Sequence, residues 1–344
     1  ETAIEMNPKL TLAYIKKGNL AVNGRMWEDA IPAYKQAVSL DPNNGLAHQK
    51  LGEAYYLSKK YDLAKVELQK YSELVPEDID AKAKIVSFLF QLKEYEQAAN
   101  ASMDILNSDS TNILALRGLM YSEFELKRYQ DGNTVAQKFW QNAAQSKVKP
   151  MDYVYSARLA AQVGDTARAF SYFTPAIAAD SNNADLYSEY AKTLYTAKRY
   201  QEAANQYAAK NAKFGNLTSL DYYYWGRANF SAKNYVLADS AFAQFADKNP
   251  TSPDGWLWQA KSLVQQDPEL KEGAAYPFYQ KYIEIAQVDP TKNKANLLEA
   301  YQYSGLYNFY KANDKAASKA SLDKALELDP SNADIKELVK SLGL

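Results

Sequence analysis

The phrase AVSLDPNN at residues 37–44 returns near the other end of the chain as ALELDPSN at residues 325–332. In both places an apolar segment stops at Asp-Pro, and an Asn follows within two residues. Proline has no amide hydrogen and cannot continue a helix, so each phrase predicts a helix end and a sharp turn. A stop that recurs predicts a repeated structural unit, and the related IAADSNN at residues 177–183 favours the same interpretation.

The charges of the chain nearly cancel, because 40 Lys and Arg face 41 Asp and Glu. No global field therefore recruits nucleic acid or an anionic membrane, and any electrostatic preference has to be local. The lack of cysteine excludes disulfides, thiol nucleophiles and cysteine metal sites. No apolar run approaches the ~20 residues of a membrane span, so we expect no direct membrane insertion.

The first residues, ETAIEMNPKL, lack the basic and apolar regions of a secretory signal. They have the pattern of a helix end followed by its stop, so we expect residues 1–10 to be the end of a preceding repeat helix. Such a start is typical of a chain that has lost its leader. Together with the many tyrosines and the lack of cysteine, it favours the cell envelope or periplasm over the cytoplasm.

A column of aromatic residues recurs along the chain, and its first four members are spaced by 34 residues each time. It begins with Trp27, Tyr61, Tyr95 and Tyr129 and resumes at Tyr200 and Tyr235. A small residue follows three positions later each time, where two helix backbones can approach closely: Ala30, Ala64, Ala98, Gly132, Ala203 and Ala238. This register predicts nine helix pairs over residues 11–332, which start near 11, 45, 79, 113, 150, 184, 219, 253 and 299. Residues 333–344 are then predicted to form a C-terminal capping helix.

At this register the sequence resembles the tetratricopeptide repeat family, whose unit of 34 residues is a pair of antiparallel helices. The first unit carries the family signature as Tyr14, Gly18, Ala21, Trp27, Ala30, Tyr34, Ala37 and Pro42. Met120 departs from it, since the family prefers glycine at that position. The resemblance implies an all-α, right-handed superhelical solenoid, in which neighbouring pairs stack because one pair alone exposes too much apolar surface. It also implies a non-catalytic scaffold that binds a protein or peptide.

Catalytic and metal-binding residues are scarce in the sequence. His48 is the one histidine, in a helical column that other repeats fill with packing residues, so we expect it to pack. Without a second histidine or any cysteine, the common zinc and nucleophile–base arrangements cannot be assembled. Acidic turns such as SDSTN at residues 108–112 lack the length and closing glutamate of a calcium loop. We therefore predict no enzyme activity, no metal site and no cofactor.

In the tetratricopeptide repeat family, positions 2, 5, 9 and 12 of each first helix line the inner, concave face. Position 9 places four cations on successive repeats here: Arg158, Lys192, Arg227 and Lys261. Arg117 at position 5 extends this stripe. The accompanying aromatic residues are Tyr121, Phe124, Tyr195, Tyr223 and Phe230. The resemblance implies that these cations and aromatic residues bind a peptide.

A basic, aromatic-lined groove suits an extended peptide that carries acidic groups or a free carboxylate. The Lys/Asn carboxylate clamp of the chaperone-tail variety is matched only at Asn19, so that specificity is not expected. Three alternatives stay open. The cations are simply solvated or paired with neighbouring carboxylates; the chain is a glycan-binding or cell-envelope assembly module, with Tyr223 and Tyr303 stacked on sugar rings; or it binds single-stranded RNA, which the near-zero net charge disfavours.

Overall fold

The computed structural model describes residues 6–215 and 217–344. Over these residues the chain has nineteen α-helices, one 3-10 turn at Gln145–Lys147 and no strand. The helices form two compact units, Glu1–Ala176 and Ile177–Leu344. The prediction of an all-α stack of helix pairs is confirmed.

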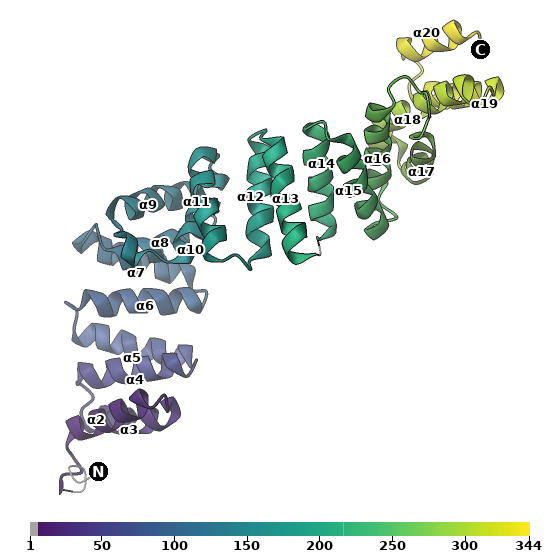
Figure 1. Cartoon of the computed structure of the whole chain (residues 1–344). Coiled ribbons are helices and arrows are strands. Elements are labelled where there is room, and N and C mark those ends of the chain that lie inside the picture. Colours follow the sequence, from purple (N-terminus) through teal and green to yellow (C-terminus); the bar gives the residue numbers. More distant parts are fainter. Residues whose placement is uncertain (1–5, 216) are drawn as a thin grey trace. The chain divides into compact units, whose positions relative to one another are not determined.

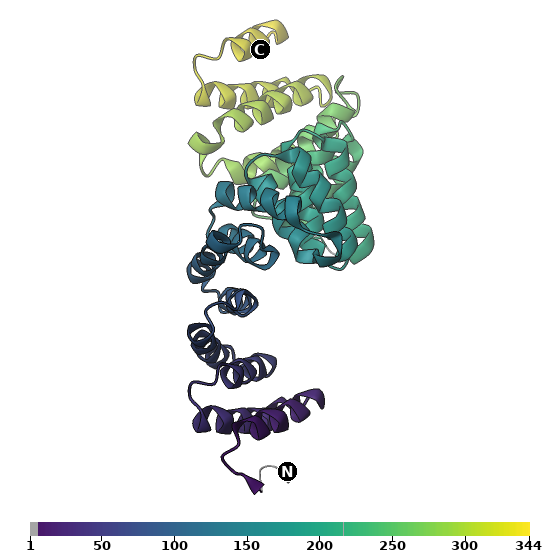
Figure 2. The ribbon, with the colours of Figure 1, turned by 90° about the vertical axis from the view of Figure 1, so that its left-hand side faces the viewer.

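In the first unit each helix packs against the next one along the chain, and consecutive helices run antiparallel (Figures 1 and 2). Its helices are α2 (Thr11–Asn23), α3 (Trp27–Leu40), α4 (Gly45–Leu57), α5 (Tyr61–Leu74), α6 (Ile79–Gln91), α7 (Tyr95–Ser108), α8 (Ile113–Glu125), α9 (Tyr129–Asn142) and α10 (Pro150–Gln162). Helix α11 (Thr166–Ala179) spans the boundary between the units.

Within the second unit, too, each helix packs against the next one along the chain. It contains α12 (Ala184–Thr196), α13 (Tyr200–Phe214), α14 (Ser219–Ser231), α15 (Tyr235–Lys248), α16 (Pro253–Gln266), α17 (Tyr276–Ala286), α18 (Pro290–Tyr310), α19 (Lys315–Leu328) and α20 (Ala333–Leu342). The predicted start at 299 lies inside α18, because Pro290 at the first helical position and the Asp289 side-chain cap begin this helix earlier. Residues 1–5 of the predicted preceding helix lie outside the described residues, and the division into nine repeats stays a prediction.

The aromatic column marks the first residue of a helix. Trp27, Tyr61, Tyr95, Tyr129, Tyr200 and Tyr235 begin α3, α5, α7, α9, α13 and α15. Two residues earlier, each turn holds a residue in the left-handed region: Arg25, Lys59, Lys93, Lys127, Lys198 and Lys233, with φ between 58° and 65°. This single left-handed residue lets the chain reverse within a few residues, so each second helix starts at a fixed point.

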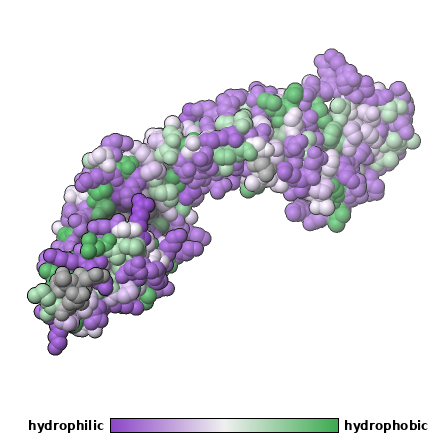
Figure 3. Space-filling model, turned by 60° about the horizontal axis from the view of Figure 1, so that its bottom comes forward, coloured by the Kyte–Doolittle hydropathy of each residue, from purple (hydrophilic) through white to green (hydrophobic). Residues whose placement is uncertain are grey.

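In several pairs the first helix has a glycine where the second helix crosses it, as at Gly18 and Gly226. A Cβ atom on Gly18 would lie 2.4 Å from the Tyr34 ring, and one on Gly226 would lie 2.6 Å from the Phe242 ring. The six small residues of the predicted crossing column are all buried. The apolar surface is thus used for packing between helices, and the face in Figure 3 is mostly hydrophilic, with hydrophobic surface in separate small patches.

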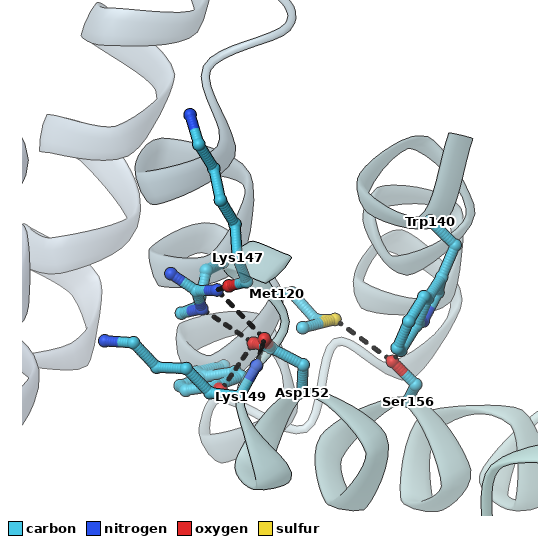
Figure 4. Close-up of polar contacts among 8 residues, drawn as sticks. Met120, Trp140, Lys147, Lys149, Asp152 and Ser156 are labelled. Carbon is cyan, nitrogen blue, oxygen red and sulfur yellow. Dashed lines mark hydrogen bonds and ion pairs between the residues drawn. The ribbon is translucent and has the colours of Figure 1, made fainter. Parts of the chain in front are cut away.

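A buried ion pair joins α8 to α10 in the first unit (Figure 4). The guanidinium of Arg117 donates hydrogen bonds of 2.7 and 2.9 Å to Asp152, whose side chain is 0% exposed. Arg117 also donates to the Lys147 carbonyl at 2.7 Å. Asp152 accepts from the Tyr121 hydroxyl and the Lys149 amide, each at 2.7 Å. One carboxylate therefore fixes two helices and the loop between α9 and α10.

The second unit contains an equivalent buried pair. Lys210 on α13 donates to Asp221 at 2.8 Å and to the Ser188 hydroxyl at 2.7 Å. Ser188 donates in turn to Asp221 at 2.6 Å. Burial alone would raise the pKa of Asp221, but the hydrogen bonds from Lys210, Ser188 and Thr218 outweigh it and hold this pKa below its usual value. Asp221 is therefore charged at neutral pH and locks α12, α13 and α14 together.

We expect Gly226→Ala to destabilise the protein by about 1–3 kcal/mol, because the new methyl group would overlap the buried Phe242 ring. The check is the urea midpoint of the helical circular dichroism signal. Gly24→Ala is the control, because Gly24 has φ −81° and the nearest atom to its added methyl is the flexible end of Met26, at 3.0 Å, with backbone oxygens no closer than 3.5 Å. Equal midpoints for the two variants would show that the helices do not cross at Gly226.

We expect Asp152→Asn to cost about 3–5 kcal/mol, because it leaves the buried Arg117 without its counter-charge. Thermal melting of the variant measures the loss. Glu96→Gln is the matched control, since it removes an exposed ion pair. The side chain of Arg128 is 42% exposed and that of Glu96 is 55% exposed. That change should cost only about 0–1 kcal/mol. If Asp152→Asn and Glu96→Gln have the same melting temperature, the buried pair does not have this structural role.

Candidate functional site

The structure separates the predicted inner-face residues into those used for packing and those that stay at the surface. In the first unit, Arg117 is 8% exposed and is taken up by the buried pair with Asp152. Tyr121 donates its hydroxyl hydrogen to the same carboxylate and stacks on Tyr155, with ring centroids 4.1 Å apart. Both side chains hold α8 against α10. Arg117 is therefore not available to an external ligand, which corrects its inclusion in the basic stripe.

Phe124 and Arg158 are neighbours on α8 and α10. The guanidinium carbon of Arg158 lies 5.9 Å from the centroid of the Phe124 ring, within range of a cation–π contact. Phe124 also meets Tyr155 edge to face, with centroids 5.4 Å apart. These two predicted residues are brought together, but the aromatic cluster under Arg158 is part of the packing between the helices.

The second unit contains the clearest candidate site, which is centred on Arg227 of α14. Its guanidinium carbon lies 4.2 Å from the ring centroid of Trp258 on α16. The terminal nitrogens contact the Tyr223 and Tyr195 hydroxyls at 3.1 and 3.3 Å, and Tyr195 belongs to α12. Arg227 forms no ion pair in the part of the chain that the structure describes, and its Nε atom has no hydrogen-bond partner there. Three helices thus hold a cation that no carboxylate neutralises.

Two lysines extend this surface. The Lys192 ammonium lies 5.1 Å from the centroid of the Tyr224 ring. The Lys261 ammonium lies 5.5 Å from the centroid of the Trp258 ring but is paired with Glu299 at 2.9 Å and donates to Asn296 at 3.1 Å. Phe230 meets Trp258 edge to face, with centroids 5.1 Å apart. We call Lys192, Tyr195, Tyr223, Arg227, Phe230, Trp258 and Lys261 the Arg227 cluster.

Trp258 is a residue of this cluster that the inner-face positions of the sequence do not predict. It occupies position 6 of its first helix, and the family positions taken for the inner face are 2, 5, 9 and 12. In the structure its ring contacts Arg227, Phe230, Phe242 and Lys261. The sequence does carry a signal for Trp258: Arg227 is an arginine at position 9, and the next repeat has a large aromatic residue in its first helix.

In the first unit, Glu53 has the position in its repeat that Arg227 has in the second unit. This carboxylate accepts hydrogen bonds of 2.8 Å from both Lys50 and Lys84. Burial by itself would raise the pKa of Glu53, but the two lysines lower it overall. Cavities of 290 and 350 Å³ open on either side of the carboxylate, the first beside Asn19 and the second beside Phe88. Both lysines here are paired with a carboxylate of the same chain, whereas Arg227 is not paired with any described carboxylate.

Other kinds of site find little support among the described residues. They contain no group of three or more His, Cys, Asp and Glu side chains placed to hold a metal ion. None of their helices is both long and apolar enough to span a bilayer. His48 is 6% exposed and lies between the Glu67 carboxylate at 2.7 Å and the Pro42 carbonyl at 3.0 Å, so it has the packing role expected from the sequence.

Comparison with solved structures shows the fold. The C-terminal part of a tetratricopeptide repeat-containing protein from Cytophaga hutchinsonii is 24% identical, over 74% of this chain and 98% of that one, with a TM-score of 0.59. A tetratricopeptide repeat protein from Parabacteroides merdae is 16% identical over 74% of this chain and 98% of that one, with a TM-score of 0.49. No protein with a curated description matches the chain.

Two family models also match the sequence. Both describe the tetratricopeptide repeat, and they match residues 25–85 and 156–214, one in each half of the chain. The matched residues include the aromatic column at Trp27, Tyr61 and Tyr200 and the buried crossing residues Ala30 and Ala203. The repeated helix pairs, their close crossings and these matches agree: residues 25–85 and 156–214 are tetratricopeptide repeats, and the chain has the fold of tetratricopeptide repeat proteins.

Proposed function

We propose that the chain is a non-catalytic scaffold that binds an extended segment of another protein, and that the Arg227 cluster binds an acidic group of that segment. The observation that carries the proposal is the position of Arg227, which lies over Trp258 and between two tyrosine hydroxyls with no carboxylate partner in the described residues. Cations that are held in place but left unneutralised within their own chain are suited to an external anion.

The geometry of Arg227 supports a carboxylate in particular. A guanidinium has five N–H donors in a planar fork that matches a carboxylate. The two tyrosine hydroxyls accept from two of these donors, and they keep their own hydrogens to donate. Lys192 adds a second cation one repeat earlier along the chain. An acidic side chain or a free C-terminus would therefore meet charge-assisted and neutral donors together.

The extended shape of the partner follows from the arrangement of the cluster. Its residues come from the first helices α12, α14 and α16, which belong to successive helix pairs. A segment that contacts all three has to run across the helices and leave its backbone groups accessible. Aromatic residues at each step, Tyr195, Phe230 and Trp258, supply apolar contact area for its other side chains.

The structure gives less support to the glycan-binding alternative. A sugar ring stacks on an open aromatic face, and Tyr223 is one of the two residues that the sequence offers for this role. Its ring already contacts Arg227, Tyr224 and Phe245. Tyr303, the other suggested residue, packs against Tyr279 with centroids 5.0 Å apart, and burial raises its pKa to about 12. We therefore propose protein binding alone.

The test uses synthetic extended peptides of about twelve residues, each made once with Asp and Glu and once with Asn and Gln in their place. We expect the acidic forms to bind more tightly, and this difference to shrink as salt rises from 0.05 to 0.5 M, because screening weakens partly exposed charge pairs. Fluorescence anisotropy measures the dissociation constants.

Replacement of Lys192 and Arg227 by glutamine should weaken binding of the acidic peptides by about tenfold or more, since a charge-assisted contact contributes about 1.5–3 kcal/mol. Lys198→Gln with Lys233→Gln is the matched control, because it removes two exposed lysines from the turns that follow the same two helices, α12 and α14. The proposal fails if acidic and amide peptides bind alike, or if the two double variants bind the acidic peptides equally.

A further inference from the structure

Two cavities of the first unit lie on either side of α7 and touch none of the residues of the predicted inner face. One, of 590 Å³, is bounded by α5, α6 and α7. The other, of 550 Å³, is bounded by α7, α8 and α9. Asn100 and Asp104 of α7 line both cavities. These two residues are one helical turn apart, so they form a polar crest with a hollow on each side.

The floors of both hollows are apolar. Ile85 and Leu89 of α6 lie in the first, and Leu116 and Leu119 of α8 lie in the second. All four side chains are less than 9% exposed, so they close the bottom of each hollow. Met103 lines the second hollow and is 41% exposed. Each hollow therefore offers an apolar floor of the kind that accepts a large aliphatic side chain.

The charges across this surface alternate in sign. Lys82 lines the first hollow, Asp104 lies on the crest and Lys138 lines the second hollow. None of the three side chains forms an ion pair or a hydrogen bond with any described residue. Glu73, the other acid of the first hollow, is already paired with Lys70 at 3.1 Å. The order across α7 is thus positive, negative, positive, and all three charges are available to a partner.

We propose that this outer face of α7 is a second docking surface, which binds an amphipathic helix of another protein. Helix α7 with its side chains is about 10–12 Å wide, so two apolar side chains that straddle it have to lie about that far apart. Residues seven apart on a helix are about 10.5 Å apart and share one face. A lysine or arginine three or four residues after the first apolar residue would then reach Asp104. Acidic residues beyond each apolar one would reach Lys82 and Lys138.

This inference does not rest on the proposed function, because it concerns different residues, in the other unit, and a partner charge of the opposite sign. The Arg227 cluster lies on first helices of the second unit and binds an acidic extended segment, whereas the α7 surface lies in the first unit and binds a cation at its centre. A failure of one proposal leaves the other standing, and each has variants that do not touch the other.

The probe is a display library of alanine-based helical peptides of about eighteen residues, in which the positions of one face vary among Ala, Leu, Glu and Lys. The full chain is the bait, and peptides that bind an Asp104→Lys variant equally well are removed. We expect enriched sequences to carry two leucines seven residues apart, a lysine between them and glutamates outside them. Enrichment of any other charge order, or no enrichment above the variant, overturns the proposal.

Affinities of one enriched peptide then test the contact directly. Asp104→Lys should weaken its binding at least about fivefold, and replacement of the central peptide lysine by glutamate should restore affinity to this variant but not to the wild type. Asp247→Lys is the control, because it reverses an exposed acid on the second helix α15 of the other unit. The proposal is wrong if the control weakens binding as much, or if the charge exchange restores nothing. Circular dichroism shows that each variant keeps its helices.

Discussion

The structure depends on the close crossing of the two helices within each pair. At Gly18 and Gly226 the backbone of the first helix lies directly against an aromatic ring of the second, Tyr34 or Phe242, with no room for a methyl group. The second helix contributes an alanine at its own crossing point, such as Ala30 or Ala238, which is 0% exposed. With the backbones this close, each ring is buried on both faces. The remaining apolar surface of the pair is then presented to its neighbours, so stacking is a consequence of the crossing.

The two buried ion pairs join neighbouring helix pairs in the same way. Asp152 and Asp221 both occupy the third position of a first helix, where each also accepts the backbone amide of the residue before its helix. Each carboxylate then captures a cation from the preceding pair, Arg117 in one unit and Lys210 in the other. Neither charge remains uncompensated, which is the condition for burying an ion pair at tolerable cost. The helix cap and the joint between neighbouring pairs therefore depend on the same side chain.

The fold could be predicted from the sequence because its determinants are local and periodic. The aromatic column, the small residues and the Asp-Pro stops lie at fixed separations, so one register places most first helices. Its predicted start near 299, however, lies inside α18. Here α17 is short and α18 is long, and the turn between Gln266 and Tyr276 has Asp267 accepting three backbone amides. The assignment of Arg117 to the inner face failed for a related reason. Helix periodicity gives the direction of a side chain, but the longer joint before α10 brings the Lys147 carbonyl and Asp152 over it.

The same limit explains why only part of the cationic stripe remains as a candidate site. The position of a cation in the repeat does not reveal whether an acid lies opposite it, because that acid comes from a different helix. Lys261 meets Glu299 of α18, whereas Arg227 meets aromatic residues from α14 and α16 and a tyrosine hydroxyl from α12. A guanidinium that is partly removed from water and left without a counter-ion raises the free energy of the folded chain. A cation–π contact with Trp258 compensates for only part of this, at about 0.5–2 kcal/mol. If a partner supplies a carboxylate there, as we propose, that carboxylate would recover more of this free energy and would so contribute to the affinity of the complex.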